Sequence, residues 1–372
     1  MKIAYDHQIF TLQDYGGVSR YFFELLDHLH KTGSAEIDLW VRFSNNRYLE
    51  GAAFSSHRRL WPGRAFRGKV RLVDHLNRPH SLKRLAAQGF DIFHPTYFDP
   101  YFLRALGRKP FVLTIHDMIH EVYPGLFTRR DKTPVWKEAV AGSAARILAD
   151  SQNTKRDIIR LLGIDEERID VVYLAGSLDN HEGRAGAAPL GLPGRFILFV
   201  GGRLDYKNFR PFARAVAPLL KDEPALGVVC AGGGPFRREE RRFLRELGVE
   251  DRFLQRDIDD RTLASIYAAA EVFVFPSLQE GFGVPILEAF GCGCPVALSR
   301  ASSFPEVAGE AGLYFDPADE ASIRETVRRA LDDGELRDTL RSRGKEQLRK
   351  FSWAKTAEET LAVYGKALLR WV

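Results

Sequence analysis

The sequence predicts an α/β protein with two parallel-sheet domains. Short apolar runs alternate with longer helical segments along most of the 372 residues, a pattern typical of parallel sheets covered by helices on both faces. Residues 176–194 interrupt the alternation, because they hold five glycines and two prolines without apolar periodicity. We therefore expect one domain at 1–178, a linker at 179–194 and a second domain at 195–352.

In the first domain, a glycine pair follows the first predicted strand. Gly16 and Gly17 precede a long helix expected at 18–31. Glycines allow close approach of a ligand to the backbone, and free N–H groups at a helix N-terminus attract anions; a simple turn is the alternative. The strands expected in this domain are 2–5, 36–43, 91–94, 111–115, 146–149 and 169–173.

The second domain repeats the alternation of strands and helices. Two long amphipathic helices are expected at 319–331 and 335–349, and another at 353–369 ends the pattern. The carboxyl ends of open parallel sheets are where ligands of such folds bind. The strands expected here are 196–200, 226–231, 252–254, 272–275, 295–298 and 313–315.

The most informative stretch, 277–295, follows the strand at 272–275. Gly281 and Gly283 permit a tight turn, and Pro285 suits the first position of a helix. Glu280 and Glu288 frame this turn. Carboxylates would repel phosphate, so we expect them to accept hydrogen bonds from hydroxyls, while the backbone N–H groups suit phosphate. Together they describe a nucleotide-sugar site; the alternative is a plain turn with one capping and one solvated glutamate.

The segment Glu280-Gly-Phe-Gly-Val-Pro-Ile-Leu-Glu288-Ala resembles the E-x7-E signature of family 4 of the retaining glycosyltransferases. The likeness runs from Gly16 to Trp353. It implies a GT-B fold, in which two Rossmann-like domains face a central cleft and residues 353–372 cross back to the first domain. It also implies transfer of a hexose from a nucleoside-diphosphate sugar, with retention of configuration.

The resemblance assigns roles to residues of the second domain. Arg203 and Lys207 match the pair that holds the donor diphosphate, although a pair of solvated surface cations is the alternative. Glu280 would hold sugar hydroxyls and Glu288 the ribose. The main chain near Ile258 would meet the base, and the backbone of Gly281, Phe282, Gly283 and Val284 the sugar or phosphate.

In the first domain, the resemblance assigns Gly16 and Gly17 to the glycine loop that approaches the diphosphate. His116 matches a histidine that contacts the donor sugar and helps to orient the acceptor, and we expect Asp117 to orient its ring. His116 and His120 lie four residues apart, but no third ligand completes a metal site. A structural histidine with its hydrogen bonds satisfied is the alternative for both.

No metal is expected. Asp257 and Asp259 spell a D-x-D pattern, but Asp259 or Asp260 is more simply the N-cap of a helix at 261–269. The resemblance is to metal-independent enzymes. We expect no cofactor beyond the nucleotide-sugar co-substrate.

The sequences of residues 5–10, 17–21 and 114–117 are most similar to those of bacterial mannosyl- and rhamnosyltransferases of surface polysaccharide assembly. It predicts GDP-mannose as donor and a glycan or lipid-linked acceptor. A UDP- or dTDP-sugar donor, a nucleotide-sugar 2-epimerase and a non-catalytic sugar-binding protein are the alternatives.

The expected location is the cytoplasm, with peripheral contact to the inner face of the membrane. The chain has three cysteines, no membrane-length apolar run and no signal-peptide pattern at its start. Residues 1–175 hold 26 Lys and Arg against 20 Asp and Glu, which implies an acidic partner. Residues 57–71 contain six cations, no acid and two aromatic residues, Trp61 and Phe66, as an interfacial segment would. A solvated basic loop or a glycan-binding patch is the alternative, and no nucleic-acid partner is expected.

Overall fold

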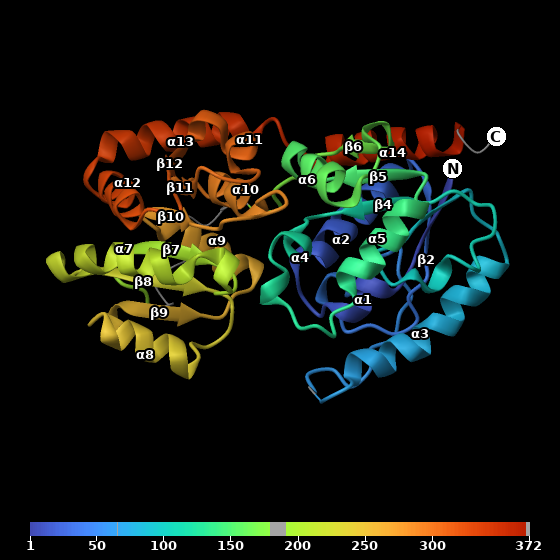
Figure 1. The fold of residues 1–372 in the computed structure, drawn as a ribbon, viewed down its shortest axis with the longest axis horizontal. Helices are drawn as coiled ribbons and strands as arrows, with labels where there is room; N and C mark the ends of the chain where they lie inside the picture. The colour runs from blue at the N-terminus through green and yellow to red at the C-terminus, as the bar shows by residue number, and fades with distance from the viewer. Residues whose placement is uncertain (65, 179–190, 370–372) are drawn as a thin grey trace. The chain divides into compact units, whose positions relative to one another are not determined.

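The computed structural model describes residues 1–64, 66–178 and 191–369, and the chain divides into two compact α/β units (Figure 1). The first unit comprises Met1–Leu174 and Trp353–Val372, and the second comprises Ala175–Ser352. Most of the expected linker, from 179 to 190, lies outside the described residues. Within the described part of the chain, no helix combines the length and the apolarity needed to cross a membrane.

The first unit contains two three-stranded parallel sheets, with strand orders β2-β1-β3 and β4-β5-β6. A parallel bridge between Phe93 and Phe111 connects them. The strands are β1 (Lys2–Tyr5), β2 (Glu36–Leu39), β3 (Ile92–His94), β4 (Val112–Ile115), β5 (Arg146–Ala149) and β6 (Ile169–Val171).

The strand predicted at 36–43 is shorter than expected. β2 ends at Leu39, although the Trp40 N–H group still donates to the Tyr5 carbonyl at 2.8 Å. Beyond it, the Asn77 side-chain oxygen accepts hydrogen bonds from the N–H groups of Arg42 and Phe43 at 3.0 and 2.9 Å. A side chain therefore replaces the ladder partner there.

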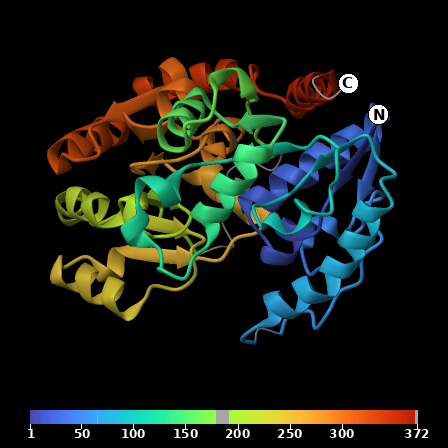
Figure 2. The same cartoon turned by 45° about the vertical axis from the view of Figure 1, so that its right-hand side comes forward.

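The last helix, α14 (Trp353–Leu369), belongs to the first unit. In both views α14, in red, lies alongside the blue and green elements of that unit (Figures 1 and 2). Its Tyr364 hydroxyl lies 2.8 Å from the Tyr5 hydroxyl and 2.6 Å from His94 Nδ1, so the helix is bonded to the ends of β1 and β3. The other helices of this unit are α1 (Gln8–Leu12), α2 (Gly17–Thr32), α3 (Lys69–Ala86), α4 (Ile119–Val122), α5 (Thr133–Ser143) and α6 (Gln152–Leu162).

The second unit has one six-stranded parallel sheet, with the order β12-β11-β10-β7-β8-β9. Numbered within the unit, this is the doubly wound Rossmann order 3-2-1-4-5-6 read from its other edge. The strands are β7 (Arg195–Val200), β8 (Leu226–Ala231), β9 (Phe253–Arg256), β10 (Val272–Phe275), β11 (Val296–Ser299) and β12 (Gly312–Phe315).

Helices cover both faces of the second sheet. Alternate strand residues such as Ile197 and Phe199 join a buried cluster with residues of three helices, α7, α8 and α12. On the opposite face, Phe273 meets Tyr267 and Phe275 meets Phe304. The helices are α7 (Phe209–Asp222), α8 (Arg238–Glu246), α9 (Asp260–Ala269), α10 (Val284–Gly291), α11 (Phe304–Ala308), α12 (Glu320–Asp332) and α13 (Gly334–Leu348).

Candidate functional site

The turn between β10 and α10 depends on Gly283. This residue is the N-cap of α10 and has φ 100, a left-handed conformation that favours glycine. A Cβ atom there would lie 3.1 Å from both Ile286 and Phe304. Glu288 lies in the second turn of α10 and is 5% exposed.

Two serines after β11 hold this turn from the side. The Glu280 N–H group donates to Ser302 Oγ at 3.0 Å, and the same hydroxyl donates to the Glu280 carbonyl at 2.6 Å. Ser303 Oγ donates to the Phe282 carbonyl at 2.8 Å. No role was predicted for these serines from the sequence. The sequence feature that could have indicated such a role is a pair of serines soon after a buried strand.

Lys207 and Glu280 form an ion pair. Their Nζ and Oε1 atoms lie 2.5 Å apart, and the two side chains are 16% and 13% exposed. The strands before them, β7 and β10, are neighbours in the sheet, and the Leu278 N–H group donates to the Tyr206 carbonyl at 2.8 Å. The cation expected at the diphosphate and the carboxylate expected at the sugar are therefore side by side.

Arg203 does not project freely from its loop, so the alternative of a solvated surface cation does not describe it. Its side chain is 3% exposed, and its Nε atom donates to Glu240 Oε1 at 3.1 Å. Its terminal nitrogens donate to the carbonyls of residues 232–235 at 2.8 to 3.4 Å. Its role at the diphosphate stays a prediction, and a role in holding the 232–235 loop is added.

That loop contains three successive left-handed glycines. Gly232, Gly233 and Gly234 have φ values of 79, 70 and 69. A Cβ atom on Gly233 would lie 2.5 Å from the Gly201 carbonyl oxygen and 2.9 Å from an Arg203 nitrogen, so only glycine fits. This loop was not predicted from the sequence, although a glycine triplet directly after a buried strand is a signal for it.

The second aspartate of the D-x-D segment, Asp259, has a structural role. Asp259 caps α9 by accepting a hydrogen bond from the Thr262 N–H group at 2.7 Å, as expected. Hydrogen bonds from Thr262 lower the pKa of Asp259. Ile258 packs over the glycine loop. A Cβ atom added to Gly232 would lie 3.2 Å from the Ile258 side chain. Among the described residues, no three His, Cys, Asp or Glu side chains are grouped to hold a metal ion.

In the first unit, Gly16 and Gly17 lie at the start of α2, with Gly16 as the N-cap. The Gln13 side-chain oxygen accepts from the Ser19 N–H group at 3.0 Å. The Ser19 hydroxyl donates to the Gly16 carbonyl at 3.0 Å. One of the N–H groups expected to face an anion is thus already bonded to the protein.

His116 is oriented by Asp150. Its Nδ1 atom lies 2.7 Å from Asp150 Oδ2, whereas Asp117 Oδ1 accepts from the Ile119 N–H group at 3.0 Å. The expectation that Asp117 orients this ring was therefore wrong, because the Asp117 carboxylate instead accepts from the N–H group of the first residue of α4. Burial raises the pKa of the Asp150 carboxyl, and the His116 ring opposes that rise. His120 stacks on Phe127 with the ring centroids 3.9 Å apart.

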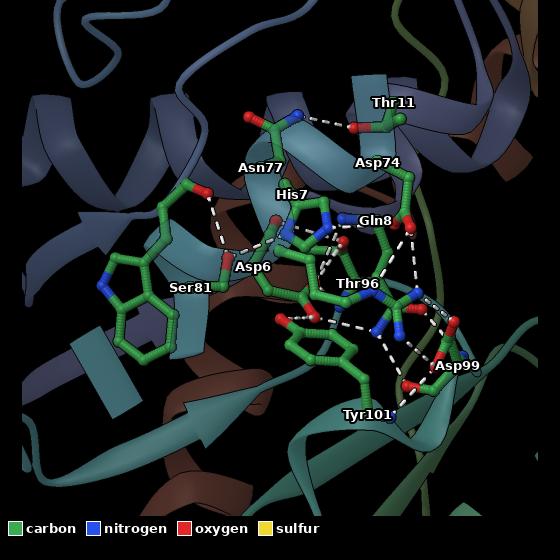
Figure 3. Close-up of polar contacts among 12 residues, drawn as sticks. Asp6, His7, Gln8, Thr11, Asp74, Asn77, Ser81, Thr96, Asp99 and Tyr101 are labelled. Carbon is green, nitrogen blue, oxygen red and sulfur yellow. Dashed lines mark hydrogen bonds and ion pairs between the residues drawn. The ribbon is translucent and has the colours of Figure 1, made fainter. Parts of the chain in front are cut away.

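A polar network joins the ends of β1 and β3 to α3 (Figure 3). His7, which is fully buried, lies 2.7 Å from Ser81 Oγ and 3.2 Å from Asp74 Oδ1. Arg78 in turn pairs with Asp74 and Asp99 at 2.9 and 2.5 Å. The network fixes α3, whose first turn overlaps the basic stretch 57–71. The buried Asp6 carboxylate completes it by accepting from Gln8, Thr96 and Tyr101.

The basic stretch exposes its two aromatic side chains. Trp61 and Phe66 are 43% and 45% exposed, and their ring centroids lie 5.7 Å apart. Arg59 pairs with Glu50 at 2.8 Å, and Lys69 lies 3.7 Å from Asp14. Three aliphatic residues of α3, which begins within this stretch at Lys69, are also exposed: Val70, Leu72 and Leu76. Residue 65 lies outside the described residues.

Comparisons with known proteins point to one enzyme family. Residues 194–333 match the family model described as Glycosyl transferases group 1, and residues 15–175 match the model described as Glycosyltransferase Family 4. The chain is 30% identical to O-antigen chain mannosyltransferase B of Escherichia coli over 73% of this chain and 74% of that protein. It is 29% identical to D-inositol 3-phosphate glycosyltransferase of Corynebacterium efficiens over 75% of this chain and 72% of that protein.

Among solved structures, the chain resembles the Anabaena protein HepE in complex with UDP and glucose. The TM-score is 0.76 at 18% identity, and the match covers 98% of this chain and 99% of HepE. At that identity the likeness shows the fold alone.

Proposed function

Because this chain belongs to the family 4 glycosyltransferases and has the GT-B fold, we propose that it transfers mannose from GDP-mannose to a glycan or lipid-linked acceptor, with retention of configuration. The observation that carries the proposal is the Lys207–Glu280 pair beside the N-terminus of α10. Mannose is favoured by the sequence resemblance and by the name of the Escherichia coli relative. The acceptor would belong to surface polysaccharide assembly.

In this proposal the diphosphate is the leaving group, and its developing charge is neutralised by the protein. Lys207 and the N–H groups at the start of α10 supply positive potential, and Arg203 adds to it. Glu280 accepts hydrogen bonds from sugar hydroxyls, and the buried Glu288 accepts from the ribose. The bond from the anomeric carbon to phosphate breaks and the bond to the acceptor oxygen forms on the same face. The acceptor proton passes to the departing phosphate oxygen.

A thermal-shift panel of GDP-, UDP-, ADP- and dTDP-sugars tests the donor. A ligand that binds only the native state, at about 100 times its Kd, stabilises that state by about 2.7 kcal/mol. GDP-mannose is expected to give the largest shift. A larger shift with a UDP-sugar would replace the donor and favour the alternative suggested by HepE, whose structure holds UDP and glucose.

Product analysis then tests the reaction. With donor and acceptor present, the product is expected to keep the anomeric configuration of the donor. Conversion of the donor to its 2-epimer without an acceptor would favour an epimerase instead. Binding without consumption would favour a sugar-binding protein.

Transfer is expected to survive EDTA. The cations assigned to the diphosphate are Lys207 and Arg203, which are protein groups and are not removed by a chelator. The measurement is the initial rate with and without excess EDTA. Loss of activity that Mn²⁺ restores would contradict this expectation and direct attention to Asp257 and Asp259.

The segment 57–71 is expected to bind anionic membranes. Cations near such a surface contribute about 1 kcal/mol each, and the exposed rings of Trp61 and Phe66 would insert among headgroups. Changing Arg58, Arg59, Arg64 and Arg67 to Gln is expected to abolish co-sedimentation with vesicles rich in phosphatidylserine. High salt should have the same effect.

A matched control removes four exposed arginines from the second unit instead. Gln at positions Arg238, Arg241, Arg242 and Arg245 of α8 gives the same charge change, and this variant should still co-sediment. Equal loss in both variants would mean that net charge, rather than this segment, governs binding. Binding to an anionic glycan but not to vesicles would mean that the patch grips the acceptor.

A further inference from the structure

A single hydroxyl group holds both backbone polar groups of Glu280. Ser302 Oγ accepts a hydrogen bond from the Glu280 N–H group at 3.0 Å and donates to the Glu280 carbonyl at 2.6 Å. The hydroxyl therefore takes the place of the donor and acceptor that a neighbouring strand would offer to this residue. Because the two bonded groups lie on either side of the Glu280 Cα atom, they also fix the direction in which its side chain leaves the backbone. Both residues belong to the second unit.

Ser302 has an unusual backbone conformation. Its φ value is 56, in the left-handed region that residues with a Cβ atom seldom adopt. The next residue, Ser303, has an ordinary φ of -82 and is fully buried. The strain is thus confined to the residue that bonds both backbone groups of Glu280. Strained residues persist where the surrounding structure holds them in place, and they gather at functional sites.

Lys207, the partner of Glu280, lies beside a second residue of this kind. Asn208 has φ 57 and is 5% exposed, and its side-chain nitrogen donates to the Pro317 carbonyl at 2.8 Å. In the described part of the chain, four residues other than glycine have a positive φ. Two of them adjoin or hold the Lys207–Glu280 pair, and the other two lie in the first unit. In the second unit, the left-handed backbone of residues other than glycine is therefore concentrated at this ion pair.

We propose that Ser302 is a positioning residue for Glu280. Its left-handed backbone aims the hydroxyl at Glu280, and the two hydrogen bonds hold the Glu280 carboxylate beside the Lys207 ammonium group in the absence of a donor. A group that is already in place needs no reorganisation when charge develops in the transition state. This inference deepens the proposed function and rests on it for the effect on transfer. A serine that served only the fold would contribute to stability, and activity would then follow the folded fraction.

The first test measures amide hydrogen exchange of the whole protein without a donor. The Glu280 N–H group is expected to be protected in the unchanged protein, because it is bonded to Ser302 Oγ. Ser302→Gly should speed its exchange about 5- to 10-fold, the effect of losing one hydrogen bond. An unprotected Glu280 amide in the unchanged protein, or equal exchange in the variant, would overturn the proposal. Since no donor is added, this result stands even if no tested sugar is transferred and the proposed function fails.

The second test compares kinetics with stability. Ser302→Gly removes the hydroxyl, but glycine suits the left-handed backbone. The relief of strain opposes the loss of hydrogen bonds, so Tm should change by less than about 3 °C. By contrast, kcat should fall about 10- to 100-fold while nucleoside-diphosphate affinity stays within about twofold, because a small displacement of a catalytic group has effects of that size. A near-normal kcat, or a loss that only follows a lower folded fraction, would overturn the role.

A double variant tests whether Ser302 acts through Glu280. In a Glu280→Gln background, Ser302→Gly should lower kcat by no more than about twofold further, because both changes act through one carboxylate. Full additivity of the two losses would overturn the role.

Gln88→Gly is the matched control. Gln88 also has a left-handed backbone, with φ 50, and its side-chain nitrogen donates to the Leu85 carbonyl at 2.6 Å, but it follows α3 in the first unit. This variant should keep the exchange rate of the Glu280 amide and stay within about twofold in kcat. Ser302→Asn should keep more activity than Ser302→Gly, because asparagine tolerates the left-handed region and offers a donor and an acceptor. Equal losses in Gln88→Gly and Ser302→Gly, or a lower kcat in Ser302→Asn than in Ser302→Gly, would overturn the proposal.

Discussion

Lys207→Ala is expected to lower kcat about 100- to 1,000-fold, the cost of removing one preorganised group that stabilises transition-state charge. The ammonium group lies 2.5 Å from Glu280 and over the Phe275 ring, so it is held in place before any donor arrives. Turnover with saturating donor is the measurement. Lys345→Ala, at an exposed position of α13, is the control and should be neutral. Near-normal turnover of Lys207→Ala would remove this residue from the diphosphate.

Glu280→Gln separates the two halves of the pair. Gln keeps the shape and can still accept a hydrogen bond from Lys207, but it loses the charge that strengthens bonds from sugar hydroxyls. Transfer should therefore fall while nucleoside-diphosphate affinity, measured by calorimetry, holds. A parallel loss of both would place Glu280 at the nucleotide rather than at the sugar.

Arg203→Ala is a weaker test of the role of cations at the diphosphate, because the structure shows that Arg203 also holds a loop. Its guanidinium donates to Glu240 and to four backbone carbonyls, so truncation would leave the buried Glu240 carboxylate without this partner and would release the loop. A loss of activity in Arg203→Ala could follow from the disordering of that loop alone. Within the described part of the chain, Lys207 forms one ion pair, with Glu280, so the activity of Lys207→Ala reports more directly on catalysis.

Local patterns in the sequence were sufficient to place the strands. The apolar runs at 2–5, 146–149, 226–231 and 272–275 became strands with those same limits, because a buried parallel strand needs apolar side chains on both faces. The glycine–proline turn before α10 was also predicted from the sequence. Each of these signals lies within a few consecutive residues.

Partnerships between distant residues were not predictable in the same way. Asp117 follows His116 in sequence and was the expected partner, yet Asp150 bonds the ring because β5 is next to β4 in space. Arg203 meets Glu240, 37 residues later, through a glycine loop. Strand order and side-chain direction decide such contacts, and neither has a local signature.

His94 contacts Tyr364 of α14, 270 residues later, and this contact predicts an acid-sensitive fold. His94 is fully buried, and its two ring nitrogens lie 2.6 Å from the Tyr364 hydroxyl and 2.9 Å from Thr114 Oγ1. Burial, with a smaller contribution from His116, lowers the pKa of His94 from 6.5 to about 3. The folded protein therefore keeps this ring neutral under conditions in which the unfolded chain protonates it.

This difference in pKa between the folded and unfolded states makes the protein less stable as the pH falls. Below pH 6.5 the unfolded state binds a proton that the native state refuses, so the free energy of unfolding falls as the pH drops, until the folded pKa is reached. At about 1.36 kcal/mol per pH unit, the loss between pH 6.5 and 4.5 is about 2 to 3 kcal/mol. Urea titrations across that interval measure it, and a variant that removes the His94 ring is needed to separate its effect from that of carboxylates such as Asp150, whose pKa is raised by burial.

His94→Gln should flatten this pH dependence. The amide side chain offers one donor and one acceptor, as the neutral ring does, but cannot titrate. The variant is expected to be less stable than the unchanged protein at pH 7, because its shape differs, and to lose less stability on acidification. His75→Gln, at an exposed position of α3, should keep the original slope. If His94→Gln and the unchanged protein lost stability in parallel, the acid sensitivity would belong to other groups, and the bond between His94 and Tyr364 would be an ordinary packing contact.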